Sequence, residues 1–90
     1  MAIAALFEAT GTWEQYEESL TKLEEAGWGS PEARLYHVAG PTENGFRVVD
    51  VWESPETFEE FGKVLIPILQ EIGVAPPEAR VWPAQRIIEP

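Results

Sequence analysis

The chain has 90 residues, 44% of them apolar, with four Trp, four Phe and two Tyr, which predicts one folded domain spanning residues 1–90. Its 16 acidic and 6 basic residues give a net charge of −10, so neither nucleic acid nor an anionic membrane is expected as a partner. The chain has no Cys and a single His, which excludes disulfides and argues against a metal site.

The first half of the chain predicts a strand, a helix and a second strand. Residues 2–9 (AIAALFEA) are a short apolar run without the basic segment of a signal peptide, so we expect a strand in a cytoplasmic protein. Residues 12–26 have helical periodicity, and Thr12 and Gln15 have the spacing of a capping box. Residues 33–39 (ARLYHVA) follow as a strand. The predicted buried face of the helix carries Trp13, Tyr16, Leu20 and Leu23.

The second half predicts a hairpin strand, a helix and a final strand. Segment 40–45 (GPTENG) has the residues of a hairpin turn, and 46–52 (FRVVDVW) is the returning strand. Ser54, followed by a proline, is the expected N-cap of the next helix. Residues 79–88 (ARVWPAQRII) predict an edge strand, because Pro83 cannot donate a backbone hydrogen bond. The buried stripe of the helix comprises Phe58, Phe61, Leu65, Ile68 and Ile72.

The order β-α-β-β-α-β with a central hairpin predicts an α+β fold of the ferredoxin-like type. Four antiparallel strands would form one sheet, with both helices on one face. Apolar residues occur on both faces of the predicted strands. In 46–52, for example, Val48 points to one face and Val49 and Val51 point to the other. Because the helices cover only one face, we expect the open face to bind a second copy of the chain in a homodimer.

The stretch VVDVWESPETF (48–58) joins an acidic residue, a Trp, a Ser cap and an aromatic residue at the junction of the third strand and the second helix. It is similar to the same junction in the dimeric α/β-barrel superfamily, and within it to antibiotic-biosynthesis-monooxygenase-type domains. The likeness covers nearly all 90 residues in element order and length. The resemblance implies a dimeric α/β barrel, a fold that serves oxygenases, haem-degrading enzymes, isomerases and peroxidases.

The resemblance implies no haem and no other cofactor. Haem-degrading members carry an Asn near the end of the first strand, a Trp nine residues after the signature Trp, and a His on the second helix. This chain has Phe7-Glu8-Ala9 and Phe61 at the first two places and no His on the helix. Similar cofactor-independent monooxygenases oxidise electron-rich phenols in a pocket of Asn, Trp, Arg and Tyr. The candidate counterparts here are Trp52, Arg47, Tyr36 and Arg86.

His37 and Asp50 are the candidate catalytic residues. A neutral imidazole can act as a general base near pH 7, and a carboxylate in an apolar strand needs a polar partner. Pairing Gly40 with Gly45 would place His37 opposite Val48 and one diagonal step from Asp50. A register shifted by one residue would place the two on opposite faces. The alternatives are a structural His and a salt bridge of Asp50 with Arg34, Arg47 or Arg86.

Four further side chains are candidate substrate contacts: Trp52, Tyr16, Tyr36 and Phe61. Aromatic rings can stack on an aromatic substrate, and Tyr hydroxyls can bind a polar group. The alternative for each ring is packing in the core or at an interface, and for each hydroxyl a bond to the backbone.

These features predict a small-molecule pocket enzyme, similar to cofactor-independent monooxygenases, that acts on a hydrophobic or aromatic substrate. Glycine-rich phosphate loops, Ser/His/Asp arrangements and Cys-x-x-Cys pairs are absent from the sequence. One alternative is a non-catalytic ligand-binding or interaction module of the same fold. A second is an isomerase or lyase that uses His37 as its base.

Overall fold

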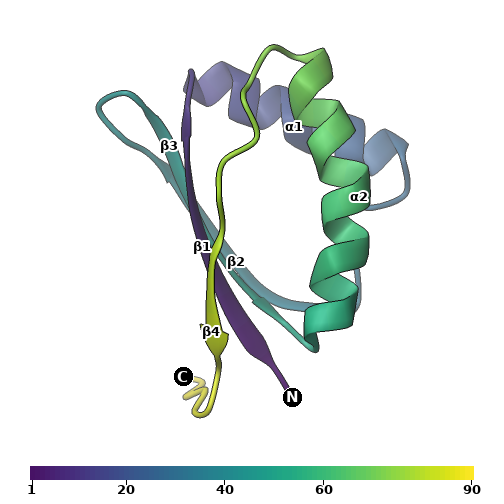
Figure 1. Ribbon diagram of the computed structural model, residues 1–90, viewed down its shortest axis with the longest axis vertical. Helices are drawn as coiled ribbons and strands as arrows, with labels where there is room; N and C mark the ends of the chain where they lie inside the picture. Colours follow the sequence, from purple (N-terminus) through teal and green to yellow (C-terminus); the bar gives the residue numbers. More distant parts are fainter.

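The computed structural model describes residues 1–90 and contains six elements in the predicted order (Figure 1). The strands are β1 (Ile3–Thr10), β2 (Arg34–Pro41), β3 (Gly45–Trp52) and β4 (Arg80–Pro83), and the helices are α1 (Trp13–Glu25) and α2 (Pro55–Glu71). Neither helix has the length and apolar character needed to cross a membrane.

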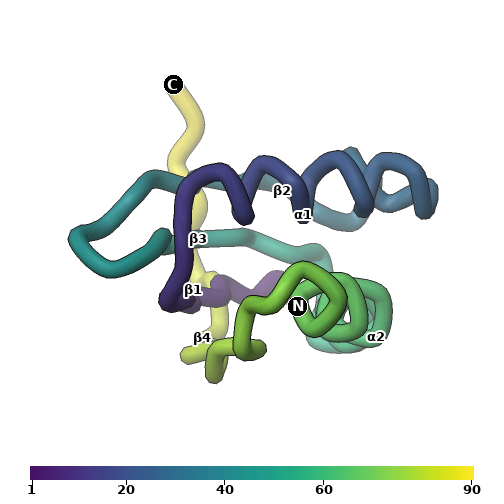
Figure 2. The backbone as a smooth tube through the Cα atoms, turned by 90° about the horizontal axis from the view of Figure 1, so that it is seen from above, coloured from purple at the N-terminus to yellow at the C-terminus, as the bar shows by residue number.

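The four strands form one antiparallel sheet in the order β2-β3-β1-β4. Both helices lie against the same face of this sheet, as Figure 1 shows from the side and Figure 2 from above. No helix covers the other face, and the sheet is open, with β2 and β4 at its edges. The predicted α+β, ferredoxin-like fold is confirmed.

Both helices begin where the sequence predicts. The side chain of Thr12 accepts a hydrogen bond from the backbone N–H of Gln15, whose side chain accepts one from the backbone N–H of Thr12. Ser54 caps α2 in the same way, with Thr57 as its reciprocal partner. These bonds satisfy N–H groups that the first turn of a helix leaves free, and each cap stabilises the fold by about 1 kcal/mol.

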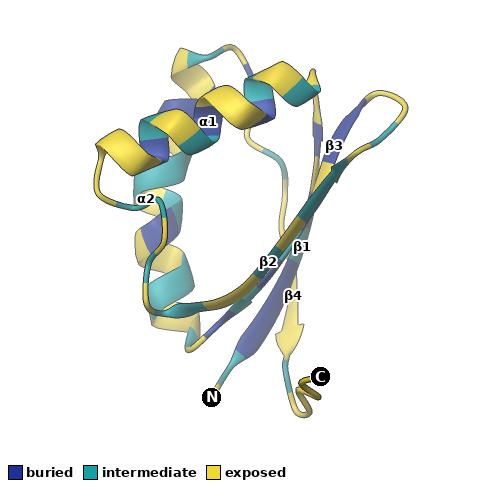
Figure 3. Cartoon of the chain, turned by 180° about the vertical axis from the view of Figure 1, so that it is seen from behind, coloured by how far each residue is buried: buried dark blue, intermediate teal, exposed yellow.

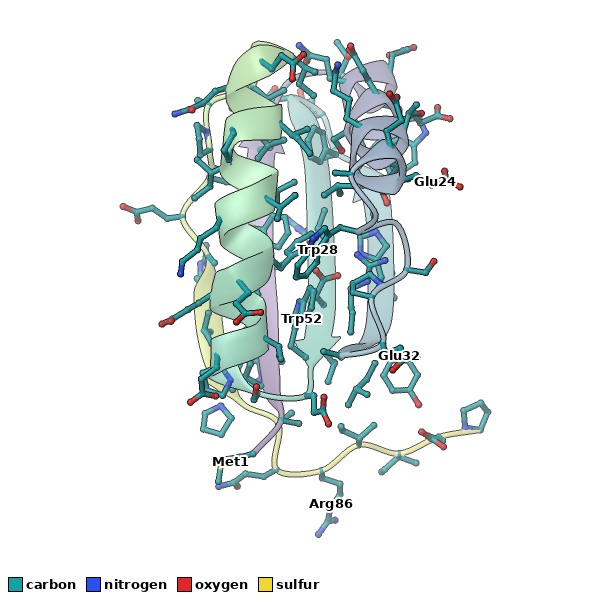
Figure 4. All side chains as sticks on the ribbon, turned by 90° about the vertical axis from the view of Figure 1, so that its right-hand side faces the viewer. Met1, Glu24, Trp28, Glu32, Trp52 and Arg86 are labelled. Carbon is teal, nitrogen blue, oxygen red and sulfur yellow. The ribbon has the colours of Figure 1, made fainter.

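Two clusters of buried side chains fill the layer between sheet and helices. Figure 3 colours the buried stretches of β1, β3 and the two helices dark blue. Figure 4 shows Trp28 and Trp52 in this layer, between α2 and the connection that leads into β2. The cluster near the hairpin end comprises Phe7, Ala9, Tyr16, Phe46, Val48, Leu69 and Val74. The cluster at the opposite end comprises Ile3, Ala5, Leu23, Trp52, Phe61 and Ile68.

The pairing of β2 with β3 differs from the predicted register by two residues. Gly40 lies opposite Arg47 instead of Gly45, and His37 lies directly opposite Asp50. Because side chains alternate with a period of two, a two-residue shift leaves each of them on its predicted face. The inward-facing set on β3 is accordingly buried: Phe46, Val48, Asp50 and Trp52.

A bulge in β2 changes the faces of its first residues. Strict alternation from His37 places Leu35 on the inner face. In the structure Arg34 pairs with Trp52 and Tyr36 with Val51, so Leu35 is the extra residue of the bulge. Leu35 is 46% exposed. Leu35 therefore does not share the face of His37, as regular alternation would require, and Arg34 takes the inner position.

The last strand is much shorter than predicted. We expected a strand over 79–88, whereas β4 ends at Pro83, which lies opposite Ile3 at the start of β1. One more backbone bond, from Ala84 to Ala2, follows before the chain leaves the sheet. Because β1 begins at that point, residues beyond 84 have no strand to pair with, although their side chains are apolar in part.

Candidate active site

Three polar side chains from three elements form a hydrogen-bonded row, called here the Tyr16–His37–Asp50 relay. The hydroxyl oxygen of Tyr16 on α1 lies 2.6 Å from Nε2 of His37 on β2. Nδ1 of His37 lies 2.5 Å from Oδ1 of Asp50 on β3. The other carboxylate oxygen, Oδ2, accepts a hydrogen bond of 3.3 Å from Nε1 of Trp52. No buried polar side-chain atom is left without a partner.

The carboxylate fixes the protonation pattern of the relay. An ionised carboxylate only accepts hydrogen bonds, so Nδ1 of His37 carries the imidazole proton and donates to Asp50. Nε2 of the neutral ring then accepts from the Tyr16 hydroxyl. In this arrangement a carboxylate orients an imidazole so that its other nitrogen can take a proton.

The fold positions each member of the relay. His37 and Asp50 are direct cross-strand neighbours on the inner face of the sheet. Tyr16 lies on the buried face of α1, where its ring is nearly parallel to the imidazole and stacks on Trp13 with a centroid separation of 4.4 Å. Packing against Trp13 and Phe46 therefore holds the hydroxyl next to Nε2.

Burial differs along the relay. Asp50 is fully buried, which is costly for a carboxylate unless hydrogen bonds compensate, and here His37 and Trp52 both donate to it. The His37 side chain retains 23% of its exposure because β2 is an edge strand. One edge of the imidazole therefore contacts solvent. No group of three or more His, Asp or Glu side chains converges as a metal site.

The relay borders a small apolar pocket between the helices and the sheet. Tyr16, His37 and Asp50 line this inner pocket, whose volume of about 30 Å³ has room for a water molecule or two. A larger groove of about 680 Å³ lies beside it, between α2 and the segment that leads into β4. The two spaces share five apolar wall residues: Phe7, Phe61, Leu65, Leu69 and Pro77.

The same architecture occurs in solved structures of other proteins. A "putative antibiotic biosynthesis monooxygenase" from Deinococcus radiodurans superimposes with a TM-score of 0.65 at 14% identity, over 99% of this chain and 97% of that one. This likeness shows a shared fold. No protein-family model matches the chain, and no curated protein matches it in sequence.

Two further solved structures have a similar fold. A conserved protein of unknown function from Bacteroides thetaiotaomicron, described as a "possible oxidoreductase", has a TM-score of 0.62 at 12% identity, over 90% of this chain and 95% of that one. A conserved protein from Methanosarcina mazei has a TM-score of 0.62 at 14% identity, over 91% of each chain. At these identities the likeness concerns the fold alone.

Within this fold, the structure brings five of the six predicted site residues together. Tyr16, His37 and Asp50 form the relay, and Trp52 donates a hydrogen bond to the Asp50 carboxylate. The ring of Phe61 stacks at a tilt on that of Trp52, with a centroid separation of 4.8 Å, and forms part of the shared wall.

The sixth predicted site residue, Tyr36, lies on the opposite face of the sheet. Its hydroxyl donates a 2.7 Å hydrogen bond to Glu89, because side chains alternate along β2 and His37 takes the inner face. Arg47 is also on the outer face and pairs with Glu8. Arg86 extends from the C-terminal segment, away from the sheet (Figure 4). None of these three side chains reaches the inner pocket.

Arg34 is a pocket residue that the sequence analysis considered only as a salt-bridge partner. Its guanidinium donates to the carbonyl of Gly29 at 3.1 Å and lies over the ring of Phe61 at 5.9 Å. Together with the relay residues it lines the inner pocket. The bulge in β2 turns Arg34 inward in place of Leu35. The pattern of apolar residues in the sequence does not indicate this change of face.

Burial raises the pKa of the Tyr16 hydroxyl above its usual 10.0, and the negative charge of Asp50 raises it further. The hydroxyl thus stays protonated at neutral pH and donates to His37. The neutral form is favoured in the fold, so its contribution to stability is complete below pH 10.0 and is lost as pH rises through the folded pKa.

We predict that this shift can be measured directly, since the chain has only two Tyr. In Tyr36→Phe, the ultraviolet absorbance of phenolate reports Tyr16 alone, and its midpoint should lie above 10.0 in the folded protein. In urea the midpoint should return to about 10. Equal midpoints in the folded and unfolded protein would show that the hydroxyl is not held in the relay.

Proposed function

We propose that the protein is an enzyme that oxidises a hydrophobic phenol-type substrate with O₂ and without a bound cofactor. The Tyr16–His37–Asp50 relay at an apolar pocket is the observation that carries this proposal. Such a relay can remove a proton from a weak acid, and the surroundings suit an aromatic body. The oxygenase-type name of the Deinococcus radiodurans fold neighbour supports oxidation over other reactions that begin with proton removal.

His37 is the general base in this proposal, and Tyr16 connects it to the substrate. Both imidazole nitrogens already form hydrogen bonds, so the substrate cannot bond His37 directly. Its hydroxyl donates instead to a lone pair of the Tyr16 oxygen. The substrate proton moves to that oxygen as the Tyr16 proton moves to Nε2 of His37. Asp50 stabilises the imidazolium that results, and Nε2 later returns the proton through Tyr16 to the oxygen atom that leaves as water.

The groove beside α2 is the proposed binding site for the apolar body of the substrate. It is large enough for a two- or three-ring molecule, whereas the inner pocket is not. Rotation of Leu65 in the shared wall opens the way from the groove to Tyr16, while Phe61 keeps its place against Trp52 and Arg34. Phe61 is then a substrate contact, whereas Trp52 acts through Asp50.

The proposed reaction needs no reductant because the substrate supplies the electrons. A phenolate is electron-rich enough to reduce O₂ directly. One oxygen atom becomes a carbonyl at the carbon para to the phenol oxygen, the C–H bond there is lost, and the second oxygen atom leaves as water. For 1-naphthol the products are 1,4-naphthoquinone and water, so that atoms and electrons balance.

O₂ consumption with 1-naphthol tests the proposal. The wild type should consume one O₂ per quinone formed, and His37→Ala should lower turnover by about 10²- to 10⁴-fold, the usual contribution of a general base. Tyr36→Phe is the matched control, because it removes a hydroxyl from the other face of the sheet and should keep full turnover. Equal turnover in wild type and His37→Ala would sink the proposal.

A non-catalytic ligand-binding module is the rival function that one observation favours. The inner pocket is small and the relay is fully satisfied without a ligand, as in a structural network. This reading predicts ligand binding in the groove with no turnover of 1-naphthol. An isomerase or lyase that uses His37 as its base would instead show turnover that does not depend on O₂.

The open sheet face supports a further part of the proposal, a homodimer with the sheets packed face to face. On the outer face, two rows of side chains run across all four strands. Arg80, at the end of the second row, is their only charged residue. The first row comprises Tyr36, Val51, Ala4 and Trp82, and the second comprises Val38, Val49, Leu6 and Arg80. Val38 is 66% exposed, which is unusual for a strand Val unless a partner covers it.

Sedimentation measures this dimer. The wild type should sediment as a dimer and Val38→Lys, which places a charge within the apolar face, as a monomer. Glu43→Lys in the hairpin turn, a charge change beside the face, should remain dimeric. A wild type that is monomeric at micromolar concentration would contradict the proposed assembly.

A further inference from the structure

We infer that Arg34 forms an anion-binding site in the inner pocket, which takes the acidic oxygen of an aromatic ligand whose body lies in the groove. This inference rests on the proposed function and names the chemical class of its ligand: an aromatic molecule with a phenolate-, enolate- or carboxylate-type oxygen. Arg34 then recognises the charge that the relay generates.

The first support is that Arg34 has no carboxylate partner. The ion pairs of the chain join Lys22 to Glu71, His37 to Asp50 and Arg47 to Glu8. In a protein with a net charge of −10, a partly buried guanidinium that forms no ion pair is unexpected. A guanidinium has five N–H donors, and the only hydrogen bond that the Arg34 side chain makes is the one to the carbonyl of Gly29. Donors therefore remain for a ligand.

The second support is the bulge in β2. Without it, Leu35 would fill the inner position and Arg34 would face solvent. The bulge instead exposes a leucine and turns a cation into an apolar pocket, an exchange that costs stability on both counts. Bulges beside active sites commonly redirect one side chain in this way.

The third support is that the guanidinium is held in place. The carbonyl of Gly29 binds one of its nitrogens, and the ring of Phe61 packs under its flat face. Both Arg34 and Tyr16 line the same small pocket, and the positive charge of Arg34 acts to lower the pKa of Tyr16 against the larger raising effect of burial. An oxygen in the pocket would therefore meet the fixed guanidinium donors of Arg34, next to the hydroxyl oxygen of Tyr16.

The charges of the pocket remain balanced through the proton transfer. Before it, Arg34 and Asp50 are opposite charges and the ligand is neutral. After it, the ligand is negative and His37 is positive, so the total does not change. Asp50 does not repel the new anion strongly, because His37 and Trp52 donate to its two oxygens and the imidazolium neutralises its charge.

A matched pair of unreactive probes tests the site: 1-naphthoate, which is anionic, and 1-naphthamide, its neutral isostere. Titration calorimetry should show tighter binding of 1-naphthoate by the wild type, despite the net charge of −10. Arg34→Gln should weaken 1-naphthoate binding by about tenfold or more, as expected for loss of a charge-assisted hydrogen bond, and leave 1-naphthamide binding nearly unchanged. Arg80→Gln, on the outer face, should leave both affinities unchanged.

Two results would overturn the inference. A wild type that binds 1-naphthamide as tightly as 1-naphthoate has no anion site, and this result needs no folded variant. If Arg34→Gln weakened the binding of both probes equally, Arg34 would only pack against Phe61. Because neither probe is oxidised, the binding result is independent of 1-naphthol turnover. Selective 1-naphthoate binding without 1-naphthol turnover would support the anion site and refute the oxidation. Turnover without selective 1-naphthoate binding would refute the anion site alone.

Discussion

Trp52→Ala should destabilise the fold by about 5 kcal/mol, as measured by urea unfolding followed by circular dichroism. Trp52 is fully buried and stacks at a tilt on Phe58 and Phe61. Truncation would leave a cavity the size of an indole and remove one of the two donors to Asp50. A chain of this size has about 5–13 kcal/mol of stability in total, so much of the variant should be unfolded at 25 °C.

Trp52→Phe separates the two contributions of the indole. It keeps most of the ring contacts and removes Nε1–H, so the loss should be smaller, about 1–3 kcal/mol. The same unfolding midpoint for wild type and Trp52→Ala would contradict the view that Trp52 joins the core to the relay. A Trp52→Phe loss as large as that of Trp52→Ala would assign nearly all of the effect to the hydrogen bond.

Local signals in the sequence were sufficient to predict most of the fold. Thr12 and Ser54 cap their helices through residues three positions later, and a contact of that range can be recognised from spacing alone. Alternation on β3 was likewise sufficient to place Val48, Asp50 and Trp52 on one common face, which in the structure is the buried one. The extent of β4 was not predictable in this way, because it depends on where β1 starts in space and not on the residues of 79–88.

The candidate site was predictable only to the level of a shared face. His37 and Asp50 lie on the same face in any register that differs from the observed one by an even number of residues. Their direct pairing depends on the form of the hairpin turn, which the sequence GPTENG leaves open. The contact of Tyr16 with His37 joins residues of a helix and a strand and depends on how α1 packs on the sheet. Tyr16 was predicted as a substrate contact and lies in the pocket as part of the relay.

Arg34 and Tyr36 show why a single bulge matters for reading a site from sequence. Both belong to β2, and an ideal strand would give them the same face. The inserted Leu35 separates them, so that Arg34 faces the pocket and Tyr36 the open face. Nothing in the pattern RLYHV marks the bulge, since each residue type there is compatible with a regular strand.

Asp50→Asn should lower 1-naphthol turnover by about 10³- to 10⁴-fold while the protein stays folded. The amide has the shape of the carboxylate but offers only one acceptor. Its oxygen can accept from Trp52, and its NH₂ group then donates to Nδ1 of His37. That change moves the imidazole proton to Nε2, where it opposes the Tyr16 hydroxyl and prevents uptake of a proton.

The tautomer itself provides a readout that a merely structural role would not change. Nitrogen-15 NMR of the single His should report a proton on Nδ1 in the wild type and on Nε2 in Asp50→Asn. Glu8→Gln is the matched control, because it makes the same chemical change at a carboxylate on the outer face, which pairs with Arg47, and should alter neither turnover nor tautomer. If Asp50→Asn kept the wild-type tautomer and lost turnover, Asp50 would act by its charge. If it moved the proton and kept turnover, His37 would not be the base.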